Sequence, residues 1–116
     1  YGPGGTAFLI ELKTWEELSK SGTHLCMKYN QFNHYLRTAE RLPDCTPLLV
    51  VYNETETRRL GKRAKVGIQD MRKIRFRFST KDHCVHFSTK HLRMSTVSDL
   101  LVSLKSELSM ERWLAQ

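Results

Sequence analysis

The sequence lacks any long hydrophobic run. Its longest apolar stretch, residues 48–52, has the length of one strand, whereas a helix that crosses a membrane needs about 20 apolar residues. The opening, residues 1–5, also lacks the pattern of a signal peptide. We interpret residues 1–6 as a linker or the edge of an excised domain. We expect residues 7–116 to form a single α+β domain, because this length is typical of one.

Cysteine is scarce, and the three that occur cannot all pair within one chain. They are Cys26, Cys45 and Cys84. An odd and widely spaced set indicates reduced thiols and an intracellular compartment. We therefore expect the three cysteines to be small buried residues rather than disulfide partners.

Motifs of catalysis are absent as well. The sequence has no P-loop, no glycine-rich dinucleotide turn, no nucleophile elbow and no HExxH pair. Its acidic residues are scattered over stretches that we predict to be exposed, whereas catalysis needs acids or bases gathered in a cleft. We expect no enzymatic activity and no cofactor.

One short stretch carries several side chains that can bind metals: Asp82, His83, Cys84, His86 and His91. If residues 83–87 form a strand, His83 and His86 point to opposite faces, and Cys84 shares a face with His86. A structural zinc site needs four convergent ligands, and this stretch leaves the fourth to be found. We expect surface histidines here and no metal.

Acidic residues are nearly missing from residues 58–77, where Asp70 is the only one. This segment carries a net charge of +8, so the rest of the chain sums to −1. Such a local excess predicts a binding surface rather than a general aid to solubility. The candidate residues are Arg58, Arg59, Lys62, Arg63, Lys65, Arg72, Lys73, Arg75 and Arg77.

Two interpretations of this basic segment stay open. Its side chains could contact the phosphate backbone of a nucleic acid, or they could keep an edge strand from pairing with other chains. Because Phe76 and Phe78 alternate with Arg75 and Arg77, we expect the phenylalanines to point into the core, away from any base. If exposed, residues 58–65 could also act as a nuclear import signal.

The first half of the chain predicts a strand followed by a helical turn. Residues 7–13 alternate like a strand, and Thr14 and Glu17 have the spacing of a capping box for a short helix from Trp15 to Lys20. The alternative is one helix from Thr6 to Lys20. Further on we predict a strand at 24–29 that continues over 32–36, a loop at 42–47, and a central strand at 48–52 that is buried on both faces.

The second half begins with an exposed connection over residues 53–63 and a short strand over 65–69. Strict alternation predicts a strand at 74–78 with one buried and one basic face. We interpret residues 84–87 as its hairpin partner, with a helix from Ser79 as the alternative.

The last element is an amphipathic helix that begins after a cap at Ser95 or Thr96. Its apolar residues recur at helical spacing and predict contact with the sheet. They are Val97, Leu100, Leu101, Leu104 and Leu108. Met110, Trp113 and Leu114 lie beyond the best periodicity, and they are candidates either for a partner contact or for the domain core.

The strand over 73–79, the run of Cys84, Phe87 and Leu92, and the closing helix resemble a pleckstrin-homology-like domain. The chain most resembles the amino-terminal domain of a meiotic double-strand-break accessory family. Trp15, Ser21 with Gly22, and Phe32 fall at matching places, whereas residues 53–65 depart from the pattern. The resemblance implies a role as a protein-binding scaffold. Some such domains bind lipid headgroups or nucleic acid.

Residues 8–12 and the turn after Ser21 also resemble the opening of the signal recognition particle Alu-domain proteins, which bind RNA on a basic sheet. We therefore expect an α+β fold in which a twisted antiparallel sheet packs against the final helix. The favoured function is a non-catalytic protein-interaction domain of a larger intracellular protein, in the nucleus rather than the cytoplasm. The alternative is an RNA- or DNA-binding domain that contacts phosphates through residues 58–77.

Overall fold

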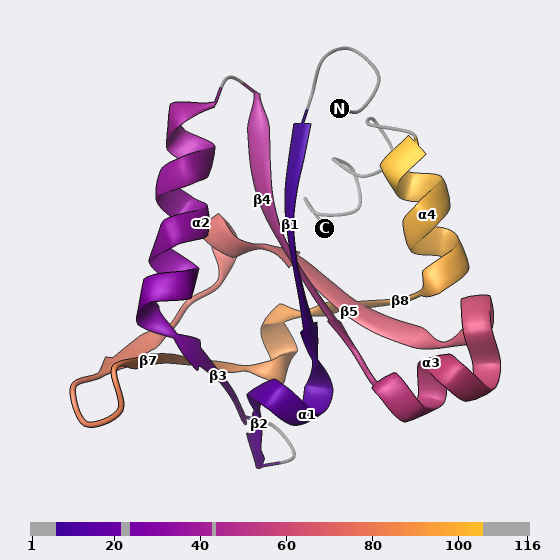
Figure 1. Cartoon of the computed structure of the whole chain (residues 1–116), viewed down its shortest axis with the longest axis horizontal. Coiled ribbons are helices and arrows are strands. Elements are labelled where there is room, and N and C mark those ends of the chain that lie inside the picture. Colours follow the sequence, from indigo (N-terminus) through magenta and orange to yellow (C-terminus); the bar gives the residue numbers. More distant parts are fainter. Residues whose placement is uncertain (1–6, 22–23, 43, 106–116) are drawn as a thin grey trace.

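Two four-stranded sheets and four α-helices make up the computed structural model, which describes residues 7–21, 24–42 and 44–105 (Figure 1). In order across the first sheet lie β1 (Ala7–Thr14), β4 (Cys45–Tyr52), β5 (Lys65–Asp70) and β8 (Arg93–Thr96). In order across the second lie β2 (Ser19–Ser21), β3 (His24–Lys28), β7 (Cys84–Ser88) and β6 (Arg77–Ser79). The helices are α1 (Trp15–Leu18), α2 (Tyr29–Arg41), α3 (Glu54–Leu60) and α4 (Val97–Lys105). The chain is therefore mixed α+β, as predicted.

The first sheet is mixed rather than antiparallel, because β1 and β4 run parallel along their whole length. Parallel neighbours require a long crossover, and α1, β2, β3 and α2 supply it. Strand then helical turn is the correct interpretation of residues 7–18, and the single-helix alternative is wrong. The prediction of a wholly antiparallel sheet is also wrong.

Strand β4 is the centre of the first sheet, as predicted, and it starts earlier than the expected end of the loop. Pro47 lies inside it although proline cannot donate a backbone hydrogen bond. The pairing of β4 with β5 begins only at Leu48, so Pro47 has β1 as its one neighbouring strand. The missing donor therefore breaks no bond to β5.

One hydrophobic core lies between the first sheet, the second sheet and α2. It contains Leu49 and Val51 from β4, Leu25 and Val85 from the second sheet, and Phe32 from α2. Residues 32–36 are thus helical, and the prediction of a continued strand there is wrong. At helical spacing, residues 32, 35, 36 and 39 all face one side of α2.

A second core lies on the opposite face of the first sheet, beneath α4. Leu48 and Val50 of β4 pack there against Leu100, and Leu104 covers its edge. The helix begins where expected, since the Thr96 hydroxyl accepts a hydrogen bond from the Asp99 amide at 3.1 Å. The predicted burial of Leu101 is wrong, because that side chain is 42% exposed.

The predicted strand over 74–78 forms only in part. A 3₁₀ turn, η3 (Met71–Lys73), leads into an extended stretch, and regular pairing with β7 covers residues 77–79. The predicted hairpin with residues 84–87 is confirmed, and the alternative helix from Ser79 is wrong. The turn ends at His83, which takes a positive φ of 55°.

The exposed connection after β4 is helical. Helix α3 ends at Leu60 and is capped by Gly61, whose φ of 58° with ψ of −126° suits glycine, and η2 (Gly61–Arg63) leads into β5. β5 carries the buried Val66 and Ile68, as predicted. None of the helices within the described ranges has the length and apolarity needed to cross a membrane.

Candidate functional site

The basic residues of the segment 58–77 form two groups rather than one surface. Five of them lie on α3, η2 and the first residue of β5, and four lie at or after η3. Between the two groups runs β5, whose residues 66–70 are buried. A strand of six residues spans roughly 20 Å, and Figure 1 shows α3 at its start while η3 at its end lies beside α2. The candidate basic residues are therefore divided between the two ends of β5.

The group before β5 is a solvated helical surface. The Arg58 guanidinium pairs with the Glu54 carboxylate at 2.6 Å, one helical turn away. The other four members, Arg59, Lys62, Arg63 and Lys65, are exposed, and no acid in the described ranges pairs with them. Its role as an import signal stays a prediction.

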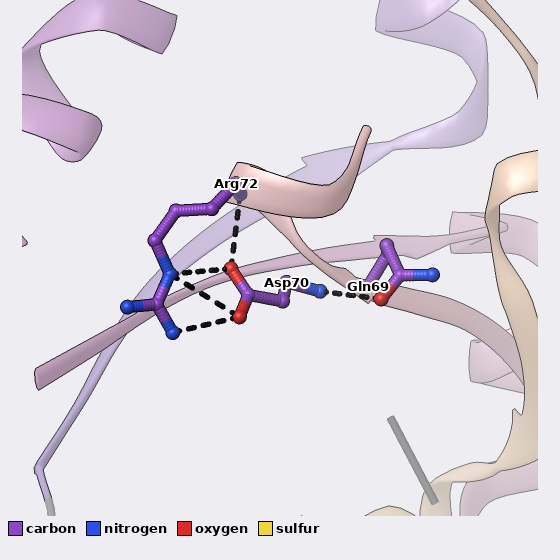
Figure 2. A network of polar contacts seen from close by, with 3 residues as sticks. All are labelled: Gln69, Asp70 and Arg72. Atoms are coloured by element: carbon purple, nitrogen blue, oxygen red, sulfur yellow. Dashed lines mark hydrogen bonds and ion pairs between the residues drawn. The ribbon is translucent and has the colours of Figure 1, made fainter. Parts of the chain in front are cut away.

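In the group after β5, Arg72 supports the fold. The buried Asp70 carboxylate accepts hydrogen bonds from the Arg72 amide at 2.9 Å and from the guanidinium Nη2 at 2.7 Å (Figure 2). This hydrogen bonding, opposed by partial burial, raises the pKa of Arg72 above its ordinary value. The Gln69 side chain accepts from the Asp70 amide and donates to the His91 carbonyl. Lys73 is exposed and also has an interaction partner.

The remaining basic residues belong to the 75–78 segment, in which two arginines alternate with two phenylalanines. Contrary to the prediction, Phe76 and Phe78 are 44% and 42% exposed. Each packs edge-on against one ring of α2. The ring centroids of Phe76 and Phe32 lie 5.0 Å apart, and those of Phe78 and Tyr29 lie 4.9 Å apart. The Phe78 ring also lies with its centroid 6.5 Å from that of His83.

A pocket of about 440 Å³ opens beside this segment. Strand β6 pairs with β7 only as far as Arg77 and His86, and beyond that point the chain turns away towards η3. The space left beside the end of β7 forms the pocket. Its lining residues are His24, Arg75, Phe76, Arg77, His86, Phe87 and Ser88.

Two histidines and a carboxylate form a hydrogen-bonded chain at this pocket. His24 Nε2 lies 2.7 Å from His86 Nδ1, and the two rings are stacked. His86 Nε2 lies 3.0 Å from Asp82 Oδ2. Desolvation works against the charge of Asp82, but hydrogen bonds from the Cys84 amide and the Ser79 side chain, with the attraction of His86, lower the pKa of Asp82.

No local pattern in the sequence indicates His24 as a site residue, because it lies 62 residues from His86. Pairing of β3 with β7 brings them together, with His24 opposite Ser88 and Cys26 opposite His86. The predicted burial of the three cysteines is confirmed, and no disulfide joins any two of them. Within the described ranges, His, Cys, Asp and Glu form no group of three that could hold a metal.

The predicted partner residues Met110, Trp113 and Leu114 lie outside the described residues, as does Leu108. The candidate functional site is therefore the 75–78 segment together with the pocket beside it. Compared with family models, with curated proteins and with solved structures, the chain matches none.

Proposed function

We propose that the chain is a non-catalytic binding domain that holds single-stranded nucleic acid along the 75–78 segment. One observation carries this proposal: two half-exposed phenylalanines alternate with Arg75 and Arg77, which pair with no acid in the described ranges. Buried phenylalanines could not stack on a base, whereas the half-exposed rings of Phe76 and Phe78 can.

The chemistry of such a segment suits a flexible strand better than a duplex. An exposed aromatic ring can stack on any base, which typically contributes about 1–3 kcal/mol per base. Arginines on the other side of an edge strand can reach the phosphates on either side of that base. The combination favours binding with little sequence preference.

Fluorescence anisotropy with a labelled oligothymidylate tests the proposal. Reversing Arg75 and Arg77 to Glu should abolish binding, and Phe76→Leu with Phe78→Leu should weaken it while keeping an apolar side chain against α2. The matched control reverses Arg59 and Arg63, which carry the same charge at the far end of β5. Equal loss of affinity in both charge reversals, or no loss in the leucine variant, would contradict the proposal.

A protein-interaction role is the second candidate. No strand in the described ranges pairs with the outer edge of β6, and an extended peptide could add there as a further strand. The parallel β1–β4 pair and α2 are features that the pleckstrin-homology-like resemblance did not imply. Peptide binding that persists at high salt, in a chain that binds no oligonucleotide, would favour this role.

A further inference from the structure

The pocket beside the 75–78 segment is an open depression lined by positive and titratable groups. Arg77 lies directly opposite His86 on the neighbouring strand, and Arg75 comes from the stretch that turns away. The nearest acid, Asp82, is hydrogen-bonded to His86 and is not among the lining residues. This charge arrangement is complementary to an anion.

The hydrogen bonds fix how the two histidines share protons. An ionised carboxylate only accepts hydrogen bonds, so neutral His86 must donate to Asp82 through Nε2. His86 Nδ1 is then an acceptor, and His24 must donate to it through Nε2. His24 Nδ1 is left as the nitrogen of the chain that can take up a proton.

We propose that this pocket binds the terminal phosphate of a nucleotide, and that the His24–His86 pair takes up one proton when the phosphate binds. The nucleotide identity rests on the proposed function, because Phe76 of the 75–78 segment also lines this pocket. A phosphate has the three acceptor oxygens that two arginines and a protonated histidine can share. A second proton on the pair would place two positive rings in contact, so the uptake stops at one.

Several charged and titratable groups surround the pair. By strand alternation Cys26 and Lys28 share the face of His24, and Cys84 shares the face of His86. The charged residues on the elements around the pair are Arg75 and Arg77 beside β7, Lys28 on β3, Lys90 in η4 (Thr89–His91), and Asp82 in the turn. Of these, Arg75 and Arg77 line the pocket, and a bound phosphate would supply negative charge to both.

The test compares a 5′-phosphorylated oligothymidylate with its 5′-hydroxyl counterpart at about pH 6 and about pH 8, on either side of the usual histidine range. Relative to its 5′-hydroxyl counterpart, the phosphorylated strand should bind the native chain about tenfold more tightly at the lower pH than at the higher pH, as expected for charge-assisted hydrogen bonds. His24→Gln keeps an amide that can donate to His86 but takes up no proton, so it should lose the pH dependence of this preference. The phosphate itself also titrates near pH 6. This effect is the same for the native chain and for His24→Gln, so it cancels when the two proteins are compared.

His34→Gln is the matched control, because His34 is an exposed histidine on α2 and does not line the pocket. If both oligonucleotides bind equally to the native chain at both pH values, the phosphate site is overturned while the proposed function stands. If neither binds, the proposed function fails, and the pocket is tested by adding inorganic phosphate while the imidazole NMR signals are followed. Absence of a shift at His24 and His86 then overturns the site. A phosphoserine peptide that binds more tightly than a mononucleotide would overturn the nucleotide identity.

Discussion

At the scale of single residues, the polar side chains that matter most for the fold lie at the end of β5. Asp70 and Gln69 are the buried polar residues among those the structure describes. The Asp70 carboxylate caps η3 by accepting from the Arg72 amide, and it also holds the Arg72 guanidinium (Figure 2). A buried carboxylate is stable only when its oxygens are hydrogen-bonded in this way.

Asp70→Ala should lower the free energy of unfolding by about 2–3 kcal/mol, because it removes a cap and charge-assisted hydrogen bonds together. Asp70→Asn should cost less, since the amide oxygen can still cap η3. Arg58→Ala serves as the control: it breaks an exposed ion pair with Glu54, which is worth about 0.5 kcal/mol or less. Urea unfolding measures all three, and equal costs for Asp70→Ala and Arg58→Ala would contradict the prediction.

Tyr35 gives a second prediction at this scale. Its hydroxyl donates to the Glu11 carboxylate, and this bond, with desolvation and the charge of Glu11, raises the pKa of Tyr35 from 10.0 to about 12. Between these values the unfolded chain loses the phenol proton while the folded chain keeps it. The free energy of unfolding should therefore fall as the pH rises from 10 to 12.

Tyr35→Phe should show a smaller fall over the same pH range, because it has no phenol proton to lose. The measurement is urea unfolding of both proteins at several pH values. Parallel pH profiles would show that Tyr35 contributes nothing to the alkaline loss of stability.

At the scale of elements, two neighbouring leucines on α4 differ in burial. Leu100 is 8% exposed and packs against Leu48 and Val50, whereas Leu101 is 42% exposed. Helical spacing allows both to lie on one apolar stripe, but only Leu100 belongs to the core on this face of the sheet. The position of the helix axis over the sheet decides which side is buried.

Leu100→Ala should lower the free energy of unfolding by about 2–5 kcal/mol through lost burial and the cavity left behind. Leu101→Ala should cost under about 1 kcal/mol, because an exposed side chain leaves no cavity. Thermal melts of the two variants make the comparison within one helix. A Leu101→Ala variant that melts as early as Leu100→Ala would contradict the placement of α4.

At the scale of the whole molecule, β4 joins the two cores. The side chains of β4 alternate between the two faces of the sheet. Leu49 and Val51 lie in the core under α2, and Leu48 and Val50 lie in the core under α4. Both layers therefore depend on one strand that lies between β1 and β5. We expect the domain to unfold as a single cooperative unit.

Leu48→Ala and Leu49→Ala open cavities in different cores, and each should cost about 2–5 kcal/mol. Because β4 couples the layers, either change should shift one shared unfolding transition. Far-UV circular dichroism and tryptophan fluorescence during urea unfolding measure this, and coincident curves are expected. Two separated transitions in either variant would show that the cores unfold independently.

Local patterns in the sequence determined several features of this protein. Alternation located β1, a continuous apolar run located β4, Val66 and Ile68 indicated β5, and the apolar spacing with Thr96 located the start of α4. The hairpin of β6 and β7 followed from the polar turn between two apolar stretches. Each of these depends on residues that are neighbours in the chain, so a short window of sequence contains the necessary information.

Tertiary structure alone decided which surfaces exist. The parallel direction of β1, the exposure of Phe76 and Phe78, and the splitting of the basic segment by β5 all depend on which strands lie side by side. Residues 32–36 fit a strand or a helix by their apolar spacing, and packing against both sheets selected α2. The His24–His86 contact arose from strands far apart in the chain. Burial is a property of neighbours in space, and a sequence window includes only neighbours along the chain.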